Sequence, residues 1–296
     1  MMVELIQQLI DGLGLGSEYA LLALGIGLTF GVMRMINFAH GELITVSAYV
    51  AYGLTLIGLD WWMLVPVIVA TSIATSVALE LVAFRWVRGA SDFAMLLMSF
   101  GVHFVVQAGF VMYVSASARA FDRPGWINNT VSVGGVRVEV VDVAVIVVTV
   151  ATLLGTLAIL RRTVYGMAIR AAAEDFDTAQ LLGVRSNLVI RSAFALAGLL
   201  AGVAAVLLLM RTGRAAPSAG LIPMLKGVLA ALIGGLGRLQ GAVVGGLVLG
   251  VVEVQLVSRL PDEVDGMVNG IVFVLIALLF IFRPAGMLRT AAAERV

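Results

Sequence analysis

The chain has 296 residues, of which 61% are hydrophobic and 12% are charged, and its mean hydropathy is +1.08. A soluble domain has about 45–50% apolar and about 25% charged residues, so this composition excludes a water-facing globule of the same length. The net charge of +1 gives no indication of nucleic-acid binding, and the lack of cysteine excludes disulfides and cysteine-ligated metal sites.

Apolar residues form long blocks along the chain instead of alternating with polar ones, which excludes the strand pattern of an outer-membrane barrel. A helix of about 20 apolar residues crosses a lipid bilayer. We therefore predict an all-α, polytopic transmembrane helical bundle of about eight or nine spans, in one domain over residues 1–296. The predicted spans are residues 17–33, 41–58, 62–84, 93–115, 141–160, 188–210, 221–236, 240–257 and 267–283.

Two regions differ from the other predicted spans. Residues 1–16 carry Glu4 and Asp11 where a signal peptide has a basic start, so we interpret them as a short amphipathic lead-in. The stretch 221–257 is interrupted by glycines, so it forms either two full spans or one span and a re-entrant element.

The arginines predict the orientation. With the connection Arg161–Arg191 in the cytoplasm, twelve arginines lie inside and six outside. The positive-inside rule favours this arrangement, which places the N-terminus outside and the C-terminus in the cytoplasm.

One predicted outer loop and one inner loop have distinct patterns. Valines alternate on both sides of Gly134-Gly135 from Val131 to Val140, which predicts a small periplasmic β-hairpin, either a cover for helix ends or a docking face. In the inner loop, Asp175 can cap a helix over Phe176–Leu182, and Gly183 can end it. So short a helix has to pack on its own protein or on a cytoplasmic partner.

The sequence contains no motif for binding and hydrolysing ATP. A phosphate-binding P-loop ends in Gly-Lys-[Ser/Thr], whereas the single lysine, Lys226, stands between Leu225 and Gly227. If ATP drives this protein, another chain hydrolyses it. We find no catalytic motif, and His40 and His103 lack the close spacing of metal ligands.

Polar residues inside apolar blocks are candidates for function, because they are costly in a bilayer. The segment Asn37–Glu42 is a polar break of the kind that lines a cavity or binds a partner. Hydrogen bonds within the bundle are the plainer interpretation of Glu80, His103, Gln107, Lys226, Glu253 and Gln255. The glycine run Gly234–Ala242 indicates close helix packing, a broken helix in a transport path, or both. The candidates for a translocation path are Asn37, Phe38, His40, Glu42, His103, Gly234, Gly235, Gly237 and Arg238.

Several motifs together resemble the permease family of branched-chain amino acid ABC importers. They are Tyr19-Ala20-Leu21, Ile36 to Glu42 (Ile-Asn-Phe-Ala-His-Gly-Glu), Arg161 to Gly166, Arg170-Ala171, Ala179 to Val184, Gly234 to Gly237 and Arg283 to Gly286. The resemblance covers nearly the whole chain in order, and the Asn-Phe-Ala-His-Gly segment is its most specific part. The chain departs from the family pattern at Arg238-Leu239-Gln240 and at Phe176.

The resemblance implies that the chain forms half of a two-permease channel, commonly a heterodimer. It also implies two cytoplasmic ATPase subunits that bind the ATP, a periplasmic substrate-binding protein, and no cofactor on this chain. Relatives of this kind also carry urea, short amides and other amino acids. The expected ATPase-docking residues are Arg170, Glu174, Asp175, Phe176, Asp177, Ala179 and Gly183, with Arg170 and Glu174 spaced to pair across one helical turn.

Two other functions compete with this one. An ion-coupled secondary carrier or channel would use Glu42, Glu80, Glu253 and His103 as coupling groups. An intramembrane enzyme would need a nucleophile and a base at a recognisable spacing, and the sequence has none.

Overall fold

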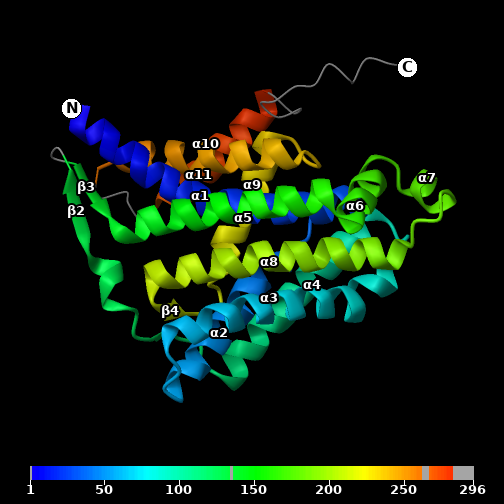
Figure 1. Cartoon of the computed structure of the whole chain (residues 1–296), viewed down its shortest axis with the longest axis horizontal. Coiled ribbons are helices and arrows are strands. Elements are labelled where there is room, and N and C mark those ends of the chain that lie inside the picture. The colour runs from blue at the N-terminus through cyan, green and yellow to red at the C-terminus, as the bar shows by residue number, and fades with distance from the viewer. Residues whose placement is uncertain (1, 134–135, 262–266, 283–296) are drawn as a thin grey trace.

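The computed structural model describes residues 2–133, 136–261 and 267–282, and this part of the chain is mostly helical (Figure 1). The helices of the first half are α1 (Met2–Met33), α2 (His40–Leu56), α3 (Trp61–Val82), η1 (Phe84–Val87), α4 (Asp92–Tyr113), η2 (Gly125–Asn128) and α5 (Val140–Arg162). Those of the second half are α6 (Val164–Glu174), α7 (Phe176–Leu181), α8 (Ser186–Thr212), α9 (Leu221–Gly234), α10 (Leu239–Val257) and α11 (Val268–Phe282). The strands are β1 (Arg119–Ala120), β2 (Thr130–Val133), β3 (Val136–Glu139) and β4 (Arg214–Ala215).

Six helical segments in the described ranges are long and apolar enough to cross a membrane. They are Val3–Met33, Trp61–Val87, Phe93–Tyr113, Val140–Arg162, Ser186–Thr212 and Leu239–Val257. Three predicted spans correspond to shorter helices, namely α2, α9 and α11. The 14 residues of α9 rise about 21 Å, less than the roughly 30 Å hydrocarbon core, so α9 fits a re-entrant element better than a full span.

The predicted lead-in is wrong, because residues 2–16 form the first half of the continuous helix α1. Tertiary contact explains the difference. Gly12 and Gly16 let α1 approach α10 so closely that a Cβ on either glycine would lie 2.8 Å from the backbone of α10. That contact stabilises a helix whose glycines alone disfavour it.

The contact between α1 and α10 depends on glycines on both helices, which run antiparallel side by side (Figure 1). A Cβ added to Gly250 would lie 2.2 Å from the nitrogen of Gly16, and one added to Gly246 would lie 2.4 Å from the nitrogen of Ala20. The glycines of α10 therefore serve close helix packing.

The helices α2 and α9 begin inside the bundle and meet there. A Cβ on Gly220 would lie only 1.8 Å from the carbonyl oxygen of Gly41, and the amide of Gly220 donates to Thr45 Oγ1 at 3.3 Å. His40, the first residue of α2, lies against Gly25 of α1 and not beside the end of that helix. The predicted polar break is thus a buried connection that returns into the bundle before α2 starts.

Connections gather at two opposite ends of the molecule. At one end β2 pairs with β3 in the register that a two-residue turn requires, Val133 with Val136, although the predicted turn Gly134-Gly135 lies outside the described residues. At the same end β1 pairs with β4, which joins the loops after α4 and α8. Figure 1 shows α6 and α7 at the other end. This grouping agrees with the predicted sidedness, and which end faces the cytoplasm stays a prediction.

Candidate functional site

The short helix of the predicted docking loop forms as the sequence indicated. Asp175 Oδ1 accepts a hydrogen bond from the amide of Thr178 at 3.0 Å, and Oδ2 accepts one from its hydroxyl at 2.6 Å. These bonds favour the charged carboxylate and lower the pKa of Asp175. Gly183 has a φ of +88° and ends the helix in the left-handed conformation.

The C-terminal end of α7 exposes two leucines. Leu181 is 88% exposed and Leu182 is 80% exposed, while Ala179 is buried and Phe176 packs against the main core. The structure extends the helical turn expected from Arg170 to Glu174 into the helix α6, in which Thr163 Oγ1 accepts from the amide of Gly166 at 3.0 Å as the cap. Phe176 and Ala179 thus hold α7 against the bundle, while Leu181 and the C-cap residue Leu182 stay exposed.

The expected pair between Arg170 and Glu174 does not form: within the described ranges no ion pair joins them. Both side chains are exposed, and an exposed pair gains little over two hydrated charges.

Two path candidates from different helices form one buried pair. His103 Nδ1 of α4 lies 2.6 Å from Glu42 Oε1 of α2, and both side chains are almost fully buried. Phe38 stacks on Phe100 of α4 with ring centroids 4.2 Å apart, and Asn37 Oδ1 accepts from the amide of Ala39 at 3.0 Å. Gln107 is only half-buried and is not part of this pair.

The other candidates divide between the end of the molecule that carries α6 and α7 and the turn before α10. Glu80 is fully buried and forms ion pairs with Arg88 and with Arg191, the latter at 3.5 Å. The turn after α9 uses Gly235 and Gly237 with φ of +89° and +83°. A Cβ on Gly234 would lie 1.9 Å from the carbonyl oxygen of Gly241, which supports close packing at this break. Arg238 follows the turn and begins α10 as its N-cap residue.

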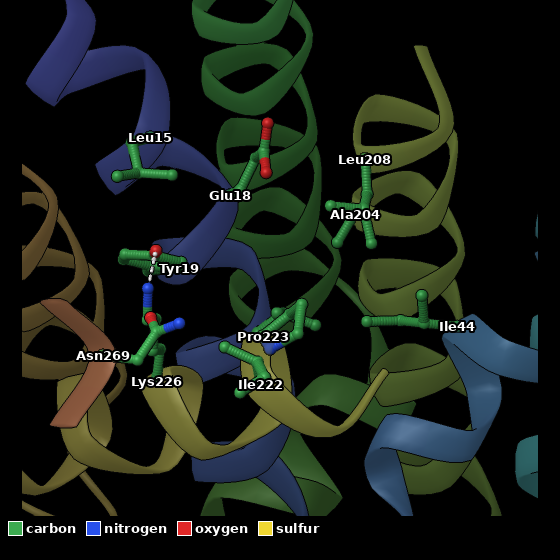
Figure 2. Close-up of a pocket in the computed structure, with 11 residues that line it drawn as sticks. Leu15, Glu18, Tyr19, Ile44, Ala204, Leu208, Ile222, Pro223, Lys226 and Asn269 are labelled. Carbon is green, nitrogen blue, oxygen red and sulfur yellow. Dashed lines mark hydrogen bonds between the residues drawn. The ribbon is translucent and has the colours of Figure 1, made fainter. Parts of the chain in front are cut away.

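A cavity of about 270 Å³ lies between α1, α2, α8, α9 and α11 (Figure 2). Its polar lining residues are Glu18, Tyr19, Lys226 and Asn269. Its apolar lining residues are Leu15, Leu22, Ile44, Ala204, Leu208, Ile222 and Pro223. Figure 2 shows Lys226 and Asn269 on one side, Leu208, Ala204 and Ile44 on the opposite side, and Glu18 at one end.

The lysine at this cavity belongs to a buried triad. Lys226 Nζ donates to Tyr19 Oη at 3.0 Å and forms an ion pair with Glu253 of α10, and Tyr19 Oη donates to Glu253 Oε2 at 3.0 Å. Both residues bond to neighbours within the bundle, which is the plainer interpretation of Lys226 and Glu253. That Lys226 also lines a cavity was not predicted.

A second charged cluster adjoins the cavity and was missed entirely. Arg211 of α8 lies 2.6 Å from Glu18 Oε1 of α1 and 2.6 Å from Asp142 Oδ1 of α5. Glu18 and Asp142 stand at the first residues of predicted spans, where a carboxylate ordinarily reaches water. Their common arginine is 69 residues beyond Asp142, so no local spacing could have revealed the cluster.

Comparison with known proteins connects this arrangement to transport. The family described as "Branched-chain amino acid transport system / permease component" matches residues 8–277. The chain is 34% identical to the high-affinity branched-chain amino acid transport system permease protein BraD of Pseudomonas aeruginosa, covering 98% of each chain. It is 33% and 32% identical to the corresponding LivH proteins of Salmonella typhimurium and Escherichia coli, covering 98% of this chain and 97% of each relative.

Proposed function

The chain belongs to the family of permease components of branched-chain amino acid transport systems, and we propose that it is the membrane-spanning subunit of an ATP-driven importer for branched-chain or related hydrophobic amino acids. The observation that carries the proposal is similarity along 98% of both chains to permeases of this one substrate class. The ion-coupled carrier has no comparable support, because the buried carboxylates Glu42, Glu80 and Glu253 are each paired within the chain.

The other subunits of the proposed assembly supply ATP hydrolysis, the second half of the path and delivery of the substrate. Two cytoplasmic ATPase subunits bind and hydrolyse ATP, since the only lysine here is not in a P-loop. A second permease, in a heterodimer, completes the path across the bacterial inner membrane, and a periplasmic binding protein delivers the substrate. The C-terminus lies on the cytoplasmic side with the inner loop.

The helix α7 is the proposed contact for an ATPase. Its exposed Leu181 and Leu182 suit a groove on a protein partner. Motion of this loop has a direct route into the bundle, because Arg34 Nη2, at the end of α1, donates to the carbonyl oxygen of Ala173 in α6 at 2.9 Å. ATP-driven closure of the partners would thus move the inner ends of α1 and α8 and change access to the path.

Reconstitution in liposomes distinguishes an ATP-driven importer from an ion-coupled carrier. The purified chain, the second permease, the ATPases and the binding protein are placed in liposomes, and leucine uptake is measured. We expect uptake only when ATP and all partners are present. Uptake by this chain alone, driven by an ion gradient without ATP, would contradict the proposal.

Co-purification tests the docking surface. Deleting residues 176–182, or replacing Leu181 and Leu182 with aspartate, is expected to abolish recovery of the ATPase with the tagged chain. The matched control is Val164→Ser, which also removes an exposed apolar side chain at this end but lies outside α7. Full recovery of the ATPase with the deletion variant would show that it binds elsewhere.

A further inference from the structure

We propose that the cavity between α1, α2, α8, α9 and α11 (Figure 2) is a binding site for a zwitterionic aliphatic amino acid. In this assignment the ammonium of Lys226 binds the α-carboxylate, Glu18 binds the α-ammonium, and the aliphatic wall receives the side chain. The proposal rests on the transport function above and deepens it by placing a substrate site within this chain.

The chemistry of the lining favours this class of ligand. The polar groups of the cavity include one cation and one anion, Lys226 and Glu18, each already held in a buried cluster. The rest of the lining is almost entirely aliphatic. A neutral zwitterion with an apolar side chain matches both features, whereas a dicarboxylate or a diamine would place a second charge against the aliphatic wall.

Lys226 retains capacity for a ligand. An ammonium has three N–H donors, and the structure uses two of them, on Tyr19 Oη and on Glu253. The carboxylate of Glu18 has acceptor sites beyond the one that faces Arg211. The helix α9 also begins at this cavity, with Ile222 and Pro223 in its first turn, so the positive end of its dipole adds to the charge that Lys226 supplies.

A purely structural role explains the lysine less well. The contact of α9 with α10 already rests on backbone approach, since a Cβ on Gly245 would lie 2.1 Å from the carbonyl oxygen of Ala230. A buried ion pair is rarely more stabilising than apolar residues of the same size. A lysine that only joined two helices would not have to line a cavity. Lys226 does line one, and Glu18 and Asn269 line the same cavity.

The single lysine allows a direct test. The chain is produced with nitrogen-15 at lysine Nζ and assembled with unlabelled partners in liposomes, so this chain contributes one labelled ammonium. Leucine carrying carbon-13 at its carboxylate is added, and the dipolar coupling between the two nuclei is measured by solid-state NMR with and without nucleotide. We expect a coupling in at least one nucleotide state, and its loss on adding excess unlabelled leucine.

Paired variants separate ligand binding from structure. Lys226→Met leaves Glu253 as a buried unpaired carboxylate, so it is combined with Glu253→Gln to remove both charges. We expect this double variant to fold and assemble with its partners, yet to take up leucine about tenfold more slowly at low substrate concentration, the factor that one charge-assisted hydrogen bond contributes. The control is Gln255→Leu, a half-buried polar residue two positions further along α10, which should leave uptake unchanged.

The outcomes are distinguishable. If leucine uptake by the native assembly works but no coupling to Lys226 appears in either nucleotide state, the site is wrong while the transport function stands. Wild-type uptake by an assembled double variant would also overturn the site. If the native assembly takes up no branched-chain amino acid, the proposed function itself fails.

Discussion

Replacing Gly250 with alanine tests the close contact between α1 and α10. The added Cβ would lie 2.2 Å from the nitrogen and 2.3 Å from the Cα of Gly16. An ordinary contact between heavy atoms begins at about 3.5 Å, so α1 and α10 would have to separate by about 1 Å. Both contacting atoms of Gly16 are backbone, so no side chain can rotate away to relieve the clash.

The expected cost follows from that geometry. Overpacking in a core costs about 1–3 kcal/mol, and a clash between backbones belongs near about 3 kcal/mol. For a chain of this size, 1 kcal/mol corresponds to about 2 °C in the melting temperature, so we expect Gly250→Ala to melt about 6 °C lower. Tryptophan fluorescence of the purified chain during heating measures this change.

The matched control uses the same pair of helices. A Cβ on Gly27 of α1 would lie 3.8 Å from the Cβ of Ala242 in α10, which is an ordinary contact. Gly27→Ala should therefore leave the melting temperature unchanged or raise it, because alanine is the better helix former. If Gly250→Ala melts within about 1 °C of the native chain, a shift of under about 0.5 kcal/mol, the close approach does not exist in the protein.

Three further predictions concern the end of the molecule that carries α6 and α7. Asp175→Ala removes the cap of α7 and should speed hydrogen exchange of its amides, whereas Asp177→Ala, in the first turn but without a cap bond, should change exchange much less. Hydrogen bonds lower the pKa of Asp175 in the folded loop. The cap should therefore persist from neutral pH down to about 4, the pKa of an aspartate in the unfolded chain, and weaken as the pH falls through the lowered pKa of the folded loop. Hydrogen exchange of the α7 amides measured across acid pH tests this. Glu80→Leu leaves Arg88 and Arg191 without their buried partner and should lower stability to unfolding by about 3–5 kcal/mol, while Arg191→Leu should cost far less because Arg191 is 42% exposed and Arg88 still pairs with Glu80.

The features that the sequence predicted correctly are those whose signals are local. The apolar blocks predict α3, α4, α5, α8 and α10 closely, because lipid requires a helix wherever such a block occurs. The cap at Asp175, the stop at Gly183 and the hairpin register depend on residues within a few positions of one another. In each case the chemistry that fixes the structure lies in the same short segment.

The features that the sequence did not predict depend on distant partners. The first half of α1 is helical because α10, more than two hundred residues later, covers its glycines. The cluster of Glu18, Asp142 and Arg211 joins three helices and is visible only after they pack. The pair of Glu42 and His103 combines two candidates whose partnership no spacing indicates.

The meeting of Gly41 and Gly220 has a mechanical consequence. Two helix starts meet there mainly through backbone atoms: a Cβ on Gly41 would lie 2.7 Å from the carbonyl oxygen of Gly220 and 3.0 Å from the Cβ of Met224. One long hydrogen bond, from the amide of Gly220 to Thr45, is the polar link recorded at this junction in the described part of the chain. Interlocked side chains give a packed interface discrete positions, whereas two smooth surfaces can turn past each other with little to break. Few side chains would therefore have to repack if α9 turned against α2 at this junction, whereas the same helix is fixed to α1 and α10 by the triad of Lys226, Tyr19 and Glu253.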